Sequence, residues 1–292
     1  MVKYMKKKIA ILLTCFNRKD LTIDCLKKIE KQKQIEGYNY QIFLVDDGSD
    51  GTGEEVGKLF DNVNVLSGNG ALFWSGGMRL AFKEAMKWGP DFYLWLNDDA
   101  LIYEDSLYRL LVQGRKLVEK GCSGILLGSM EDPNTGQITY GGKVRASKFS
   151  LSKVKMVLPD RTVCLPCDLI NGNLVLIPKI VADKLGNIKE VYTHGLGDYD
   201  YGLRAQKAGF QCLVAPGVYG ACSNNKVEGT CRDSQLTVKS RIRMLEGPVA
   251  LPPINEWLYY TREHGGILWP LFWSKSLIRK WFPSVWVKMR EK

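Results

Sequence analysis

Short apolar runs alternate with amphipathic segments through the first part of the chain. Four runs have the length and continuous apolar character of buried parallel strands, and they occupy residues 9–14, 42–45, 63–66 and 92–96. Between them apolar residues recur at helical spacing, as at Leu21, Cys25 and Ile29, where Asn17 can cap the helix, and again over residues 78–87. This alternation predicts an α/β fold with a Rossmann-like, mostly parallel sheet flanked by helices.

The pattern changes after a predicted helix that begins near Ser106. Residues 129–166 contain closely spaced Gly and Pro turn signals, which predict hairpins and a mobile loop. Strand and helix patterns return at residues 174–177, 180–185 and 210–214. We therefore predict one α/β domain over residues 1–225, followed by a C-terminal helical extension over residues 226–292.

Composition restricts the class of protein. The chain has 292 residues, of which 45% are hydrophobic, so it can bury a large core, and its net charge of +10 favours anionic partners. We find no signal-peptide pattern and no apolar run of membrane-spanning length, which predicts a cytoplasmic protein. Cys164 and Cys167 form a lone C-x-x-C pair without nearby histidines, so reduced thiols are expected rather than a zinc site.

Acidic residues follow directly after two of the predicted strands. Asp46 and Asp47 end the second strand, and Asn97, Asp98 and Asp99 end the fourth. Because ligands bind beyond the carboxyl ends of parallel strands, we expect these side chains to share one rim of the sheet. Adjacent carboxylates repel each other unless a cation compensates, and Mg²⁺ is usually held by one or two carboxylates plus substrate phosphates. The rim therefore predicts a divalent cation and a phosphorylated ligand; a solvated turn is the alternative.

Two further segments carry candidate chemistry. In the glycine-rich residues 67–77, Gly76 and Gly77 let the backbone approach a ligand closely, and the following helix start suits an anion. This segment is neither a Walker loop nor a dinucleotide fingerprint. A third acidic cluster, Asp198 and Asp200, follows the middle region.

Four motifs in this order resemble those of the family 2 inverting glycosyltransferases. Residues 11–18 (Ile-Leu-Leu-Thr-Cys-Phe-Asn-Arg) resemble the opening strand and loop, and residues 44–52 resemble the nucleotide-binding turn. Residues 96–100 are similar to the D-x-D metal motif, with Asn in the first place, and residues 197–210 to the segment with the catalytic base. The similarity spans about residues 8–215 and is nearest to bacterial rhamnosyltransferase-like enzymes. It implies a GT-A fold.

The resemblance also implies roles for individual residues. Asp99 would ligate Mg²⁺ or Mn²⁺ at the donor diphosphate, and Asp198 would be the general base. Asp200 is an alternative base, because Gly197 stands where the family often has Glu. The donor side would comprise Thr14, Asn17, Arg18, Asp46, Asp47, Gly76, Gly77, Asn97 and Asp98. Apart from the resemblance, His194, Arg204 and His264 are candidates for contacts to the acceptor or to phosphate; the alternatives are a loop histidine at position 194 and a surface group at position 264.

These motifs predict an inverting glycosyltransferase that moves a sugar from a UDP- or dTDP-sugar to an acceptor hydroxyl. The acceptor would be a saccharide, free or lipid-linked, in the assembly of bacterial surface polysaccharide. Two alternatives remain: a sugar-phosphate nucleotidyltransferase, and a catalytically inactive module that binds nucleotide sugars. A nucleic-acid partner is not expected, because the acidic rim would repel it.

The last part of the chain is basic and aromatic. From residue 268 onward, Trp and Phe interleave with Lys and Arg. This pattern is consistent with a packed helical cap, with a dimer surface, or with peripheral contact to the anionic inner face of the cell membrane.

Overall fold

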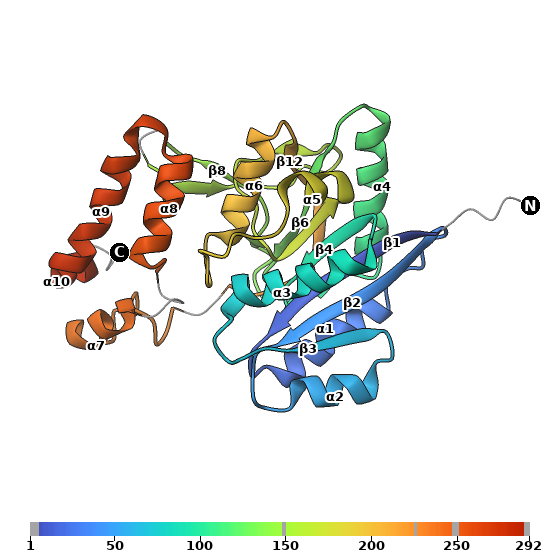
Figure 1. Cartoon of the computed structure of the whole chain (residues 1–292), viewed down its shortest axis with the longest axis horizontal. Coiled ribbons are helices and arrows are strands. Elements are labelled where there is room, and N and C mark those ends of the chain that lie inside the picture. The colour runs from blue at the N-terminus through green and yellow to red at the C-terminus, as the bar shows by residue number, and fades with distance from the viewer. Residues whose placement is uncertain (1–5, 148–149, 225–226, 247–250, 289–292) are drawn as a thin grey trace, which may run out of the picture.

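A central sheet organises the described part of the chain, which comprises residues 6–147, 150–224, 227–246 and 251–288 of the computed structural model. Among these residues the sheet has ten strands, and its main path runs in the order β10-β12-β6-β11-β4-β1-β2-β3 (Figure 1). The strands of this path are β1 (Lys7–Cys15), β2 (Tyr38–Asp46), β3 (Val63–Ser67), β4 (Phe92–Leu96), β6 (Gly124–Glu131), β10 (Leu165–Pro166), β11 (Leu174–Pro178) and β12 (Gln211–Ala221). Two short strands, β5 (Leu101–Ile102) and β7 (Ile138–Tyr140), pair with β12 and β6.

Strand direction places several chain segments at one edge of the sheet. β3, β2, β1 and β4 are parallel neighbours. β11 is antiparallel to both β4 and β6, so β6 runs in the same direction as β4. The carboxyl ends of β1, β2, β4 and β6 therefore meet the amino end of β11. The mostly parallel α/β sheet predicted from the sequence is confirmed.

Both faces of the sheet are covered, which explains why its strands are apolar throughout. In β1, Ile9, Ile11 and Leu13 belong to one buried cluster, whereas Ala10 and Leu12 belong to another on the opposite face. The first cluster receives side chains from α1 (Lys19–Glu30), α2 (Thr52–Leu59) and α4 (Ser106–Glu119). The second receives side chains from α3 (Phe73–Trp88), α5 (Lys179–Leu185) and α6 (Gly197–Lys207).

The predicted hairpin region contains a separate antiparallel pair, β8 (Lys143–Arg145) with β9 (Val154–Met156). Residues 148–149, within the predicted mobile loop, lie outside the described residues. No helix in the described part of the chain combines the length and the apolar character that a membrane crossing needs.

The C-terminal segment is helical where it is described, and Figure 1 shows it on the side of the sheet that carries α6 and β8. Its helices are α7 (Val238–Arg243), the 3-10 turn η1 (Met244–Glu246), α8 (Ile254–His264), the 3-10 turn η2 (Gly266–Leu268), α9 (Trp269–Trp281) and α10 (Pro283–Lys288). A third buried cluster joins Tyr260 and Phe272 of this segment to Tyr192, Leu169 and Leu203. The basic pattern beyond residue 288 lies outside the described residues.

Two local predictions from the sequence were wrong. Helix α3 begins at Phe73, so Gly76 and Gly77 lie inside the helix and not in a loop before it. Arg18, not Asn17, occupies the N-cap position of α1. In addition, the sequence patterns did not single out strand β6, which begins at Gly124 ahead of the predicted hairpin region.

Gly77 is needed where α3 crosses β1. A Cβ atom at this position would meet Thr14 Oγ1 at 2.1 Å. We expect Gly77→Ala to lower the free energy of unfolding by about 1–3 kcal/mol, because the helix or Thr14 must shift to accept the methyl group. Urea denaturation followed by circular dichroism measures this change. Gly57→Ala in α2 is the matched control: nothing lies within 4 Å of its added Cβ, so better helix propensity should leave stability equal or higher. A Gly77→Ala variant as stable as the control would contradict the close contact.

Candidate functional site

An open cavity of about 570 Å³ lies at the shared edge of the sheet. Its walls come from the loop after β1, the start of α3, the turn after β4 and the segment that leads into α6. Of the residues predicted to form the site, those that line it are Thr14, Arg18, Asp47, Asn97, Asp98, Asp99, His194 and Asp198. Those that do not line it are Asn17, Asp46, Gly76, Gly77, Asp200, Arg204 and His264.

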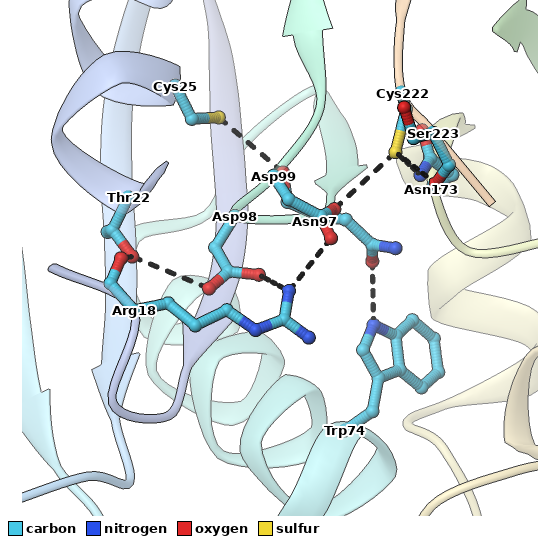
Figure 2. A network of polar contacts seen from close by, with 10 residues as sticks. All are labelled: Arg18, Thr22, Cys25, Trp74, Asn97, Asp98, Asp99, Asn173, Cys222 and Ser223. Atoms are coloured by element: carbon cyan, nitrogen blue, oxygen red, sulfur yellow. Dashed lines mark hydrogen bonds and ion pairs between the residues drawn. The ribbon is translucent and has the colours of Figure 1, made fainter. Parts of the chain in front are cut away.

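Asp98 and Asp99 share the guanidinium of Arg18, as Figure 2 shows. Arg18 Nη1 lies 3.3 Å from Asp98 Oδ1 and 2.8 Å from Asp99 Oδ2. The Thr22 hydroxyl donates to the second oxygen of Asp98 at 3.4 Å. Burial raises the pKa of Asp98 to about 7, with the Arg18 charge opposing this rise and the Asp99 charge adding to it. The Arg18 guanidinium therefore offsets the repulsion between the two adjacent carboxylates.

The Asn97 side chain holds Trp74 in the wall of the cavity. Its Oδ1 accepts a hydrogen bond of 2.9 Å from Trp74 Nε1. The Trp74 ring lies so close to Gly172 that an added Cβ there would meet the ring at 2.2 Å, and it packs edge to face on Trp95. The amide at position 97 thus fixes an indole at the site.

Asp47 holds the glycine-rich loop. Its Oδ1 accepts from the N–H groups of Asn69 and Gly70, and its Oδ2 accepts from those of Leu72 and Phe73, at 2.8–3.2 Å. A carboxylate has about four lone-pair positions, so these four donors fill its capacity. The last two donors belong to the start of α3, where no side chain of its own N-cap residue makes a hydrogen bond. Asp47 therefore caps this helix from a distance.

Asp46 and Asn17 shape the neighbouring turn. Asp46 accepts from the N–H groups of Gly48 at 3.0 Å and Gly53 at 2.7 Å. Asn17, whose φ is 51°, accepts from the Ser49 N–H at 2.8 Å. Both side chains thus fix the loops around the cavity without lining it.

Asp198 projects from the first turn of α6 and lines the cavity. Its two oxygens accept from the N–H groups of Gly172 at 3.0 Å and Tyr199 at 2.8 Å. Burial raises the pKa of Asp198, and these hydrogen bonds oppose the rise. This carboxylate has the position and the raised pKa that suit proton transfer.

Asp200 belongs to a buried network instead. It lies 2.8 Å from His264 Nε2 and 2.7 Å from Arg204 Nε, and it accepts from the Tyr192 hydroxyl at 3.2 Å. Burial opposes ionisation here, but the hydrogen bonds from His264 and Arg204 hold the pKa of Asp200 below its usual value. This network ties α8 to α6.

His194 faces the cavity from the segment that leads into α6. Burial lowers its pKa, and the nearby Arg18 charge adds to this effect. Its ring packs edge to face on Phe73, and its carbonyl accepts from the Ser75 hydroxyl at 2.9 Å. The lowered pKa favours the neutral imidazole, and the ring lies against the start of α3.

The structure also brings residues into the site that the sequence patterns did not single out. They include Phe16, Tyr140, Asn171, Gly172, Tyr199 and Pro252. The polar run Asn171-Gly172-Asn173 directly before an apolar strand was a usable signal. Because β11 is antiparallel to β4, its amino end reaches the same edge as the acidic turns.

A divalent cation fits this site only together with a ligand. Among the described residues, no group of three or more His, Cys, Asp or Glu side chains could hold a metal ion. Asp98 and Asp99 offer carboxylate oxygens, which match the binding of Mg²⁺ or Mn²⁺ by one or two carboxylates plus phosphates. The donor set therefore fits a cation bridged to a phosphorylated ligand.

Part of the chain matches a known protein family. Residues 10–135 match the family model described as "Glycosyl transferase family 2". No curated protein sequence matches the chain. The predicted resemblance to family 2 glycosyltransferases is confirmed.

Solved glycosyltransferases share the fold. A mannosyltransferase, PcManGT from Pyrobaculum calidifontis, in complex with GDP-Man and Mn²⁺, superposes with a TM-score of 0.55 at 13% identity, over 98% of this chain and 84% of that one. TarS residues 1–349 from S. aureus, in complex with UDP-GlcNAc, gives 0.55 at 15% identity, over 86% of this chain and 66% of that one. The predicted GT-A fold is thereby confirmed.

The four hydrogen bonds that Asp47 accepts predict that this carboxylate anchors the glycine-rich loop. Asp47→Asn replaces one acceptor oxygen by an NH₂ group that faces backbone N–H donors. We expect the free energy of unfolding to fall by about 1–3 kcal/mol for the buried donors left unpaired, and nucleotide binding to weaken because Gly70 and Phe73 line the cavity. Chemical denaturation and calorimetry measure the two effects. Asp50→Asn is the control, because this exposed turn carboxylate accepts from Thr52 in a manner that Asn reproduces.

Proposed function

We propose that this chain, a family 2 glycosyltransferase by its family match and fold, moves a sugar from a nucleoside-diphosphate sugar to an acceptor hydroxyl with inversion at the anomeric carbon. One observation carries the proposal: the Asp98–Asp99 pair and the Asp198 carboxylate line the same cavity. A cation-binding pair and a separate carboxylate are the two groups that such a transfer requires. The cavity volume lies within the usual range for a site of this kind.

Asp99, supported by Asp98, would hold Mg²⁺ or Mn²⁺ against the donor diphosphate. When bound, the cation would supply Lewis-acid neutralisation of the charge that develops on the departing nucleoside diphosphate. The indole of Trp74, held by Asn97, and the Phe73 ring would form the wall beside the donor and exclude water from it.

Asp198 would accept the proton of the acceptor hydroxyl. Its pKa is raised by burial, which brings its basicity closer to a working pH near neutrality. The N–H groups of Gly172 and Tyr199 orient the carboxylate. The deprotonating hydroxyl would attack from the face opposite the leaving group, so the sugar is inverted and no covalent sugar–enzyme intermediate forms.

We propose a UDP- or dTDP-sugar as donor and a saccharide, free or lipid-linked, as acceptor in bacterial surface polysaccharide assembly. The structural neighbours support nucleotide-sugar use in general, since one was solved with GDP-Man and the other with UDP-GlcNAc. A thermal-shift screen of UDP-, dTDP- and GDP-sugars, with and without Mg²⁺ or Mn²⁺, identifies the donor. Donor binding without hydrolysis or transfer in any acceptor mixture would instead indicate an inactive binding module.

Substitutions of Asp198 and Asp200, the two aspartates of α6, are expected to have different effects. Asp198→Asn should keep donor affinity within about three-fold but lower the transfer rate by about 10²–10⁴-fold, because the proton acceptor is lost. Asp200→Asn should mainly lower the unfolding temperature, because it breaks the buried contact with His264 and Arg204. Calorimetry, transfer assays and thermal denaturation on both variants separate these outcomes. Loss of transfer in a stable Asp200→Asn variant, with Asp198→Asn active, would reverse the assignment.

We further propose that α9 and α10 contact an anionic membrane surface. Their solvent-facing side carries exposed apolar residues, which are Leu271, Ile278, Trp281, Phe282 and Val285. Lys275, Lys280 and Lys288 are exposed beside them. From residue 264 to residue 290 the sequence contains no Asp or Glu, so α9 and α10 carry basic side chains and no acidic ones. Aromatic side chains at headgroup depth with flanking Lys and Arg are the features that bind anionic lipid.

Vesicle sedimentation tests this contact. The wild-type protein should bind vesicles that contain phosphatidylglycerol and not neutral phosphatidylcholine vesicles, with binding weakened by salt. A Trp281→Ser, Phe282→Ser double variant should bind at least ten-fold more weakly, since these side chains are 64% and 59% exposed. Leu59→Ser is the control, because Leu59 is 52% exposed on α2 instead. Equal binding by the double variant would refute the membrane surface, and concentration-dependent self-association that the variant abolishes would indicate a dimer.

A further inference from the structure

The cavity-facing oxygens of the acidic pair are already engaged by a cation from the protein itself. Arg18 Nη1 contacts Asp98 Oδ1 and Asp99 Oδ2 together (Figure 2). The other oxygens of the pair have separate partners: Thr22 donates to Asp98 Oδ2, and the Cys222 thiol lies 3.6 Å from Asp99 Oδ1. Arg18 therefore already contacts one oxygen of each carboxylate, where a metal ion held by both carboxylates would compete with it.

This arrangement differs from an ordinary surface ion pair in its burial. Asp98 is only 5% exposed, so its charge would be costly without a partner. The Arg18 side chain, in contrast, is 42% exposed and extends from the short loop between β1 and α1. The pair thus combines one buried and one partly buried carboxylate with a cation whose side chain has room to leave.

We propose that Arg18 is the internal counter-ion of the Asp98–Asp99 pair, which the divalent metal displaces and which the donor diphosphate then captures. The inference rests on the proposed glycosyltransferase function. Each of these oxygens has a second lone pair, but the like charges of a guanidinium and a metal ion repel each other at this distance. Metal binding to the nucleotide-free protein would therefore weaken or break the two contacts of Arg18.

The displaced guanidinium has a second partner within the cavity. A diphosphate presents paired oxygens that match the planar fork of Arg, and charge-assisted contacts of this kind are strong. A bound diphosphate would hold Arg18 away from the carboxylates and so favour the metal. By reciprocity, the metal would release Arg18 for the diphosphate, so each ligand should raise the affinity of the other.

Mn²⁺ binding with and without nucleotide measures this coupling. Electron paramagnetic resonance of free Mn²⁺ gives the metal affinity of the protein alone, and repetition with saturating UDP, dTDP or GDP gives the enhancement. Wild-type protein should bind Mn²⁺ weakly alone and at least ten-fold more tightly with nucleotide. Arg18→Gln should bind Mn²⁺ alone at least five-fold more tightly than wild type, and its enhancement by nucleotide should fall to about two-fold or less.

Two matched variants sharpen the result. Lys19→Gln removes a neighbouring positive charge that no recorded contact joins to Asp98 or Asp99, so its Mn²⁺ affinity should stay within about two-fold of wild type. Arg18→Lys keeps the charge but lacks the planar fork, so it should still exclude Mn²⁺ while showing a smaller enhancement by nucleotide. Circular dichroism checks that each variant is folded. If Arg18→Gln does not fold, the Mn²⁺ titrations of Arg18→Lys test the counter-ion role instead.

Unchanged Mn²⁺ affinity in Arg18→Gln, or an unchanged nucleotide enhancement, would overturn the counter-ion role. Asp99→Ala tests the proposed metal site separately, because it should abolish Mn²⁺ binding under both conditions. If Asp99→Ala binds Mn²⁺ like wild type, the metal assignment under the proposed function fails, whatever Arg18 does. The two failures are therefore distinguishable in one set of titrations.

Discussion

The site depends on how each buried carboxylate at the edge of the sheet is compensated. Asp46, Asp47 and Asp198 receive backbone N–H groups, which cannot leave. Asp98 and Asp99 are instead compensated by a half-exposed guanidinium. Backbone donors fix the orientation of a carboxylate and of the loop that carries the donors. A side-chain cation, in contrast, can move away and be replaced by another cation. The type of compensation therefore separates the positions that build the site from the pair at which we propose an exchange of cations.

The fold could be predicted because it follows from local patterns. Continuous apolar runs in the first strands reflect a sheet covered on both faces, and their polar ends mark one shared edge. The pattern did not indicate that β11 is antiparallel, because strand direction depends on the path of a connection of more than thirty residues. For the same reason the sequence showed Asn171 and Gly172 as polar residues before a strand but did not place them at this edge.

The roles of individual carboxylates were less predictable, because their partners are remote in sequence. Asp200 has the same residue type and the same helix as Asp198, yet its partner His264 lies on α8. Asp47 resembles a ligand-binding carboxylate in the sequence, but its oxygens are filled by the loop that begins α3. A motif indicates that a carboxylate is present at the edge; only the packing of distant segments determines what it is free to bind.

The C-terminal helices also bear on the site through such remote contacts. On α8, Glu256 accepts from the Thr193 hydroxyl at 2.5 Å, and the carbonyl of Thr193 accepts from the Ser75 N–H at 3.0 Å. This chain of contacts joins α8 to the start of α3 through the segment that carries His194. A membrane surface at α9 and α10 would then be coupled to the cavity wall, because α8 packs on α9 and also fixes that segment. At position 97 a third carboxylate would add negative charge beside Arg18, whereas the amide of Asn97 adds none and holds Trp74. When both are ionised, Asp98 and Asp99 carry two negative charges, of which Arg18 balances one and a divalent ion would balance both.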